Sequence, residues 1–161
     1  MKAHSDEDWM RVALEEAIKA YRENEIPVGA VIVKDGQIIA RAHNSTEHLQ
    51  DGLAHAEKCA IESAQRVFGK WLQGCTLYVT LEPCTMCAGA LVLSRIDRVV
   101  FGAFDEKNGA CGSLYNILYD TRLNHNPEVT SGILADKCGE ILSRFFQQKR
   151  TKNNGEVSEP A

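Results

Sequence analysis

Two short motifs in the chain combine residue types that bind metals and move protons. The first is H-A-E at residues 55–57, and the second is P-C-T-M-C at residues 83–87. Cys84 and Cys87 are three residues apart, so on a helix both thiols point to one face. One imidazole and two thiolates suit zinc, and three protein ligands leave a fourth position open to water, as in catalytic sites. The spacing therefore predicts a zinc site formed by His55, Cys84 and Cys87.

Glu57 lies two residues after the predicted ligand His55. From there its carboxylate can reach a zinc-bound water without coordinating the metal, and a carboxylate in that place can move protons. We therefore expect Glu57 to be the proton shuttle of a hydrolytic reaction. H-x-E followed by P-C-x-x-C is the signature of zinc-dependent nucleobase deaminases, which act on a base that has left its stack.

Each motif alone has other interpretations. C-x-x-C also occurs in structural metal sites and in redox pairs, although a redox pair would not need the H-A-E motif. A structural zinc site would need a fourth ligand, for which His43, His48 and His125 are candidates. H-x-E alone can serve helix capping and surface charge. The four remaining cysteines are expected to be reduced and mostly buried: Cys59, Cys75, Cys111 and Cys138.

The elements around these motifs alternate between helix and strand. Apolar periodicity predicts helices at about 6–21, 54–68, 84–94, 114–119 and 135–149, and strands at 28–33, 38–42, 75–81, 98–102 and 128–130. Ser5 with Asp8 is a capping signal, Asp35-Gly36 indicates a hairpin, and Pro83 is expected in the first turn of its helix. Helices that return between buried strands predict an α/β fold with a mixed sheet. If two helix starts lie side by side at one end of that sheet, the metal ligands converge.

Length and composition place the chain among folded domains. Its 161 residues fit one domain, and 44% hydrophobic with 25% charged residues excludes a disordered or low-complexity class. No apolar run approaches the ~18 residues of a membrane helix, and the N-terminus lacks the apolar segment of a signal peptide. We expect a cytoplasmic protein without membrane contact, with a single zinc-dependent domain over residues 1–152 and a polar, disordered tail at 153–161.

Charge is distributed unevenly along the chain. The formal net charge of −4 argues weakly against a nucleic-acid partner. Residues 141–152, however, contain no acidic side chain, and their basic groups form either a phosphate-binding rim or a solvated surface. Phe145 and Phe146 in this stretch are expected to anchor the core rather than to stack on bases. The basic residues are Arg144, Lys149, Arg150 and Lys152.

Many segments resemble the bacterial tRNA-specific adenosine deaminases, which belong to the cytidine-deaminase-like zinc enzymes. Before residue 94 they are I-P-V-G-A-V at 26–31, A-H-N at 42–44, A-H-A-E at 54–57 and T-L-E-P-C-T-M-C-A-G-A at 80–90. Later segments are S-R-I at 94–96, V-V-F-G-A at 99–103, G-S-L at 112–114, L-N-H at 123–125 and G-I-L-A at 132–135. The zinc motifs alone indicate the superfamily, whereas the later segments resemble the tRNA enzymes. The resemblance spans about residues 6–150.

This resemblance implies a three-layer α/β/α sandwich with a mixed sheet of about five strands, and a homodimer with sites near the subunit interface. It implies one zinc ion per subunit and hydrolytic conversion of adenosine to inosine at the wobble position of a tRNA anticodon stem-loop. His55, Cys84 and Cys87 would bind zinc, and Glu57 would shuttle the proton. The residues implied in substrate binding are Val28 and Ala56 around the base, Asn44 on the extruded adenosine, Asp105, Lys107, Asn124 and His125 near the anticodon, and Lys149 and Arg150 at the basic end.

The chain departs from the family pattern at two places. Gly52-Leu53-Ala54 stands where Pro-Thr-Ala is common, and Asn126-Pro127 stands where many members have an arginine that could contact phosphate. Two other functions share some of these features. A deaminase of free bases or nucleosides, such as guanine or cytidine, needs the zinc motif but no basic rim. A non-catalytic, zinc-stabilised RNA-binding module would have no use for Glu57.

Overall fold

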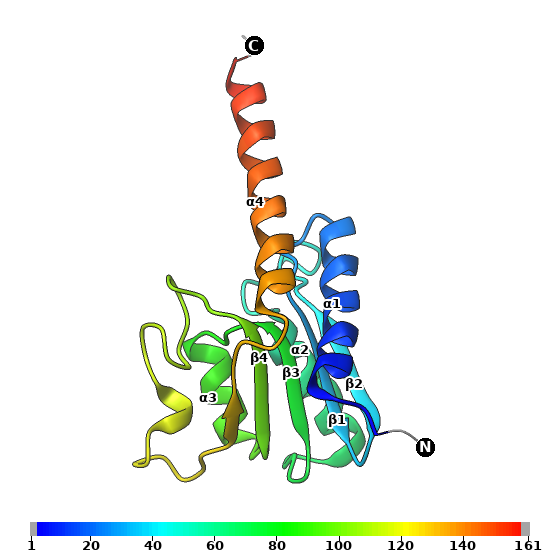
Figure 1. Cartoon of the computed structure of the whole chain (residues 1–161), viewed down its shortest axis with the longest axis vertical. Coiled ribbons are helices and arrows are strands. Elements are labelled where there is room, and N and C mark those ends of the chain that lie inside the picture. The colour runs from blue at the N-terminus through cyan, green and yellow to red at the C-terminus, as the bar shows by residue number, and fades with distance from the viewer. Residues whose placement is uncertain (1–2, 159–161) are drawn as a thin grey trace.

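A mixed five-stranded sheet forms the centre of the part of the chain that this computed structural model describes, residues 3–158 (Figure 1). Its strand order is β2-β1-β3-β4-β5, with β1 antiparallel to both neighbours and β3, β4 and β5 parallel. The elements in chain order are α1 (Asp6–Arg22), β1 (Gly29–Lys34), β2 (Gln37–His43), α2 (Ala56–Phe68), β3 (Thr76–Leu81), α3 (Thr85–Leu93), β4 (Arg98–Ala103), the 3₁₀-helix η1 (Ile117–Tyr119), β5 (Glu128–Thr130) and α4 (Ala135–Ser158).

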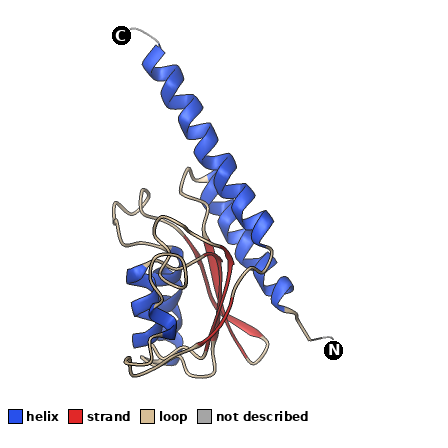
Figure 2. Cartoon of the chain, turned by 60° about the vertical axis from the view of Figure 1, so that its left-hand side comes forward, coloured by secondary structure: helices blue, strands red, loops and turns tan. Residues whose placement is uncertain are grey.

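Helices cover both faces of the sheet (Figure 2). On β1, Ile32 belongs to the core shared with α2 and α3, whereas its neighbour Val31 belongs to the core shared with α1 and α4. Successive strand residues point to opposite faces, so a sheet covered on both sides needs apolar residues at consecutive positions. The predicted α/β/α sandwich with five strands is confirmed.

Two glycines allow α1 and α4 to lie directly on the strands. A Cβ atom at Gly29 in β1 would be 2.0 Å from the carbonyl oxygen of Ala13 in α1. A Cβ atom at Gly102 in β4 would be 2.5 Å from Sγ of Cys138 in α4. Because interiors are close-packed, a side chain at either position would push the helix off the sheet.

Local signals set several element ends as predicted. Ser5 Oγ accepts a hydrogen bond from the Asp8 amide at 3.1 Å, and the Asp8 carboxylate accepts one from the Ser5 amide at 3.0 Å. This reciprocal pair is a capping box, which satisfies amides that α1 leaves unpaired. Asp35 and Gly36 have φ values of 51° and 73°. Positive φ at both central residues is the requirement of the tight turn that joins β1 to β2.

Other element ends differ from the prediction. His55 and Cys84 are the N-cap residues of α2 and α3, so Pro83 lies before its helix and not in the first turn. Both caps have extended backbone angles, so α2 begins two residues later and α3 one residue later than the apolar pattern indicates. The short helix expected at 114–119 is only the single 3₁₀ turn η1.

The last helix is longer than predicted. Instead of ending near Lys149, α4 continues to Ser158, because no proline interrupts it there. Residues 153–158, expected to be a disordered tail, are therefore helical, and residues 159–161 lie outside the described range. Across the described residues, none of the helices has the length and apolar character needed to span a membrane.

Candidate metal centre and substrate pocket

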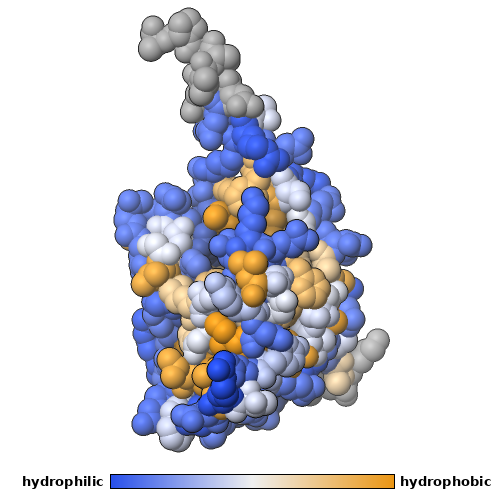
Figure 3. Space-filling model, turned by 90° about the vertical axis from the view of Figure 1, so that its left-hand side faces the viewer, coloured by the Kyte–Doolittle hydropathy of each residue, from blue (hydrophilic) through white to orange (hydrophobic). Residues whose placement is uncertain are grey.

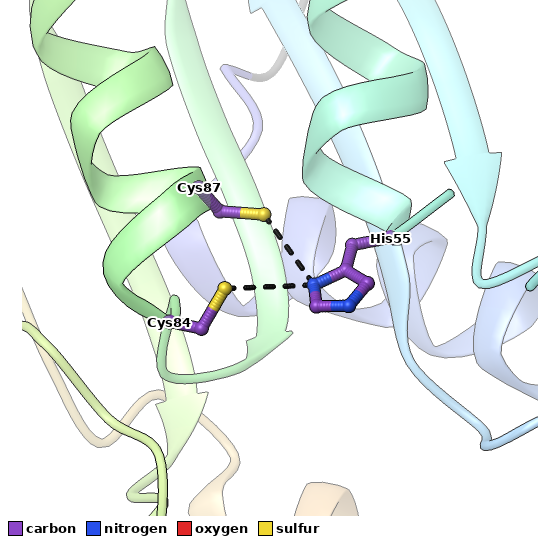
Figure 4. A group of neighbouring side chains, drawn as sticks. All are labelled: His55, Cys84 and Cys87. Atoms are coloured by element: carbon purple, nitrogen blue, oxygen red, sulfur yellow. Dashed lines mark hydrogen bonds between the residues drawn. The ribbon is translucent and has the colours of Figure 1, made fainter. Parts of the chain in front are cut away.

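The two motifs meet at the edge of the sheet where β3 and β4 end. β3 leads through Glu82 and Pro83 into Cys84, and the start of α2 lies beside it (Figure 4). Because β1 runs antiparallel, residues that precede β1 and residues that follow β2 reach the same edge. In open α/β sheets this edge is where ligands bind. The topology therefore gathers side chains from four separate strand ends.

His55, Cys84 and Cys87 form a close cluster (Figure 4). Nδ1 of His55 lies 3.5 Å from Sγ of Cys84 and 3.7 Å from Sγ of Cys87. All three ligand atoms lie within 4.8 Å of one another. Ligand atoms held tetrahedrally at ~2.0–2.3 Å from zinc would be roughly 3.5 Å apart. The donor types and their spacing both fit a zinc ion.

The histidines considered as a fourth ligand lie elsewhere. The His43 ring contacts Glu16 and Glu23, and Nε2 of His125 contacts the carbonyl oxygen of Ile96. Among the side chains that the structure describes, neither His48 nor any other histidine, cysteine or carboxylate is a fourth member of the cluster. Three protein ligands with one open position are typical of a catalytic zinc site, whereas structural sites are closed.

Hydrogen bonds within the cluster shift the pKa values of its members. Hydrogen bonds from Cys87 and His55 lower the pKa of Cys84 to about 4, and the pKa of Cys87 is raised because its thiol donates to Cys84. The hydrogen bond with Cys84 also raises the pKa of His55. Glu57, the second residue of α2, is buried, and burial raises its pKa to about 7. A carboxyl group with a pKa near neutrality can both accept and return a proton.

A pocket of about 820 Å³ opens over this cluster. Its walls come from the ends of the strands, the start of α2, the loop after β4 and one side of α4. His55, Glu57 and Cys84 line it. Six of the predicted substrate-binding residues also line it: Val28, Asn44, Ala56, Asp105, Lys107 and Arg150.

Asn44 has an unpaired donor in this pocket. Its side chain is 6% exposed, and Nδ2 has no hydrogen-bond partner among the described atoms, although its backbone amide donates to Val28. A buried donor left without a partner costs about 1–3 kcal/mol. An acceptor atom of a bound ligand would remove that cost, so Asn44 has the properties of a ligand-binding residue.

Three of the predicted substrate residues do not line the pocket. Asn124 and His125 precede β5, and the contact of His125 with Ile96 places it by the opposite end of β4. Lys149 lies on α4 with Nζ over the Phe145 ring, 5.5 Å from its centroid. Both loop residues come shortly before the strand predicted at 128–130, but the sequence does not show that this strand runs parallel to β4, which is what places its amino end away from the pocket.

Phe104 and Phe146 also line the pocket, although neither is among the predicted substrate-binding residues. Phe145 is 6% exposed and packs edge-on against Tyr21, so its prediction as a core anchor is confirmed. The same prediction is wrong for Phe146, which is 41% exposed. Adjacent helix positions point about 100° apart, and with Phe145 packed against Tyr21 the Phe146 ring is turned toward the pocket. Phe104 directly follows β4, and this position at a strand's carboxyl end was the available signal.

Comparisons with known proteins agree with this geometry. The family model described as the cytidine and deoxycytidylate deaminase zinc-binding region matches residues 3–103. The tRNA-specific adenosine deaminase of Bacillus subtilis (strain 168) is 55% identical over 148 residues, which cover 91% of this chain and 92% of that protein. The protein of the same name from Aquifex aeolicus (strain VF5) is 51% identical over 92% of this chain and 97% of its own length. A solved structure from a study of A-to-I editing by tRNA:A34 deaminases at the wobble position of transfer RNA has a TM-score of 0.80 and 45% identity, covering 83% of this chain and 98% of that one.

Proposed function

Because the chain belongs to the zinc-binding cytidine and deoxycytidylate deaminase family and, within it, to the bacterial tRNA-specific adenosine deaminases, we propose that it deaminates adenosine to inosine at the wobble position of a tRNA anticodon loop. The observation that carries the proposal is the placement of Glu57. It is a buried carboxyl group with a pKa of about 7, in one pocket with a His-Cys-Cys cluster and with the unpaired amide of Asn44.

His55, Cys84 and Cys87 would hold the zinc ion, which supplies a Lewis acid that makes water a better nucleophile at neutral pH. Glu57 accepts a proton from the attacking water, whose oxygen bonds to C6 of the adenine ring. Glu57 then delivers that proton to the ring nitrogen next to C6. The C6–N bond breaks, ammonia leaves with the second proton of the water, and inosine remains.

The other pocket residues would hold the nucleoside for this reaction. Val28 and Ala56 are apolar walls for the base, and Nδ2 of Asn44 donates to an acceptor of the nucleoside. A base must leave its stack to enter a pocket of this kind, and a loop nucleotide does so at lower cost than a duplex nucleotide. An anticodon loop therefore suits the pocket, since RNA loops are read through their splayed bases.

The basic groups around the pocket would bind the RNA backbone. Arg150 and Lys107 line the pocket, and Lys149 lies next to Arg150 on α4. Neutralised phosphates release counterions, so we expect affinity for RNA to fall with rising salt concentration. Asp105 lies in the same wall, where its carboxylate accepts hydrogen bonds from the amides of Lys107 and Asn108. A tRNA substrate also makes a cytoplasmic location part of this proposal.

A homodimer is a further part of the proposal. Leu93 on α3 is 80% exposed, and Leu114, in the loop after β4, is also exposed. Figure 3 views the side of the molecule on which α3 lies in Figure 1 and shows apolar residues gathered there, and clustered exposed apolar groups are typical of protein interfaces. Asn124 and His125 lie away from the pocket of their own subunit, so their predicted contact with anticodon nucleotides is easier to explain if a second subunit is present. Sedimentation analysis tests this; a monomer at micromolar concentration would contradict it.

Product analysis by mass spectrometry tests the proposed activity. Purified protein is incubated with an anticodon stem-loop that carries a wobble adenosine and, in parallel, with free adenosine, guanine and cytidine. We expect inosine in the stem-loop, and none when Glu57→Ala protein that retains its zinc is used. Product from a free base or nucleoside alone would preserve the zinc chemistry but overturn the tRNA substrate. No product from zinc-loaded protein would favour a binding module.

A further inference from the structure

Glu82 is a buried carboxylate to which the proposed reaction gives no part. It follows β3, two residues before Cys84, and its side chain is only 2% exposed. A buried carboxylate must find hydrogen-bond donors inside the protein, because its lone pairs are removed from water. The segment that supplies these donors is the one that Glu82 holds in place.

All four donors to Glu82 come from the loop between β4 and η1. Oε1 accepts from the Asp105 amide at 3.0 Å and from the Ser113 hydroxyl. Oε2 accepts from the amides of Cys111 and Ser113, both at 3.0 Å. The carboxylate thus joins two parts of this loop, Asp105 and Ser113, which are eight positions apart in the sequence.

The loop also wraps closely around the carboxylate. A Cβ atom at Gly109 would lie 2.3 Å from Cδ and from Oε2 of Glu82, so only glycine fits there. The Ala110 amide donates to the carbonyl oxygen of Pro83 at 2.8 Å. Glu82 and Pro83 together bind the loop to the segment that carries Cys84.

The first part of this loop is a wall of the pocket. Phe104, Asp105, Glu106, Lys107 and Asn108 all line it. The amides of Lys107 and Asn108 donate to the Asp105 carboxylate, so the conformation of the wall depends on where Asp105 is held. The Asp105 amide is the one that Glu82 binds.

We propose that Glu82 is a positioning residue for the deamination. It holds the wall formed by residues 104–108 in the arrangement that receives the RNA, at a fixed position relative to Cys84. This inference rests on the proposed function for its substrate. A carboxylate is required because both of its oxygens accept. Glutamine at this position would turn an NH₂ group toward protein donors, so at least one backbone amide would lose its partner.

The test compares Glu82→Gln with Glu16→Gln. Glu16 is also a buried carboxylate, but its partners are Lys19, Arg41 and His43, and it does not line the pocket. In the free Glu82→Gln protein the wall can move so that the unpaired amide reaches water, and binding of RNA must reverse this movement. If the reversal costs about 1.4 kcal/mol, within the range for one unpaired buried donor, the KM for the stem-loop rises about tenfold. The kcat should stay close to that of the wild type, and zinc should stay bound. Glu16→Gln should leave the KM unchanged.

Amide hydrogen exchange without RNA provides a second measurement. The amides of Asp105, Cys111 and Ser113 should exchange faster in Glu82→Gln than in the wild type, while amides of β3 should not. If Glu82→Gln does not fold, Ser113→Ala removes one of the four donors and should raise the KM in the same direction by a smaller factor.

The outcomes separate this inference from the proposed function. An unchanged KM, or a loss of kcat that only parallels loss of zinc or of folded protein, would overturn the positioning role. If wild-type protein makes no inosine, the proposed function fails. The exchange rates then still decide whether Glu82 holds the loop, and unchanged rates would overturn that as well.

Discussion

Glu57→Gln should stabilise the metal-free protein, by an amount that depends on pH. The carboxyl group has a pKa of about 7 in the folded chain because it is buried, compared with an ordinary value of 4.5. The folded state therefore keeps a proton that the unfolded state releases between these two values. Stability is lost with rising pH wherever the folded state binds more protons, at about 1.4 kcal/mol per pH unit.

The expected size follows from these two pKa values. Below about pH 4.5 both states are protonated and Glu57 contributes no penalty, whereas above about pH 7 the accumulated penalty is roughly 3 kcal/mol. Glutamine resembles the protonated carboxyl group in shape and never ionises, so the variant escapes the penalty. Cys84, whose pKa is lowered, makes the wild type more stable as pH rises, but it does so in both proteins. The difference between variant and wild type therefore reports Glu57 together with its charge interactions with Cys84 and His55.

The assay is urea denaturation of both proteins in a zinc chelator, from about pH 4 to about pH 8, across the interval between the two pKa values. The unfolding free energy of Glu57→Gln should match that of the wild type at the acid end and exceed it at the alkaline end. A difference that does not change with pH, or a variant that is less stable at the alkaline end, would refute the argument that burial keeps Glu57 protonated.

Three further predictions concern the metal and the packing. Removal of zinc with a chelator should abolish inosine formation and lower the melting temperature, and added zinc should restore both. The melting temperature falls because a ligand that binds only the folded state stabilises it. A melting temperature that does not respond to zinc would contradict this prediction. Cys87→Ala should lose zinc, measured as metal per chain, and with it activity; a fully active variant would rule out the metal site. Gly29→Ala should destabilise the fold by about 1–3 kcal/mol, because its Cβ would meet the Ala13 carbonyl oxygen at 2.0 Å. The control is Gly89→Ala in α3, where nothing lies within 4 Å of the added Cβ, and this variant should be more stable than the wild type by about 0.5–1 kcal/mol. Equal unfolding free energies for the Gly29→Ala and Gly89→Ala proteins would contradict the close approach of α1 to β1.

The sequence was most informative where local signals and composition coincide. The strands of the β1–β2 hairpin lie within one residue of the predicted positions, because two apolar runs joined by Asp-Gly leave few other interpretations. The short strand at 128–130 is also confirmed. The His-Cys-Cys cluster could be predicted because both motifs occur at helix starts, where side chains of neighbouring helices can converge.

The rest of the pocket depends on contacts between distant segments. The sequence does not show that β1 is inserted between β2 and β3, although this order brings Val28 and Asn44 to the metal. It does not show that one side of α4 closes the pocket, because an amphipathic pattern identifies a buried stripe without naming what the stripe faces. The same limit applies to Glu82, whose partners lie 23 to 31 residues away.

Because α4 is one unbroken helix, the direction in which each of its side chains points is fixed by its position in the sequence. Gly139, Leu142, Ser143, Phe146 and Arg150 form one stripe along it. Each residue advances the helix by about 100° and ~1.5 Å, so Arg150 lies ~16 Å along the axis from Gly139. A one-residue insertion between Phe146 and Lys149 would rotate Lys149 into the place of Arg150 and keep a cation over the pocket. A one-residue deletion there would bring Thr151 to that place and remove the cation, so the helix tolerates a change of length in one direction only.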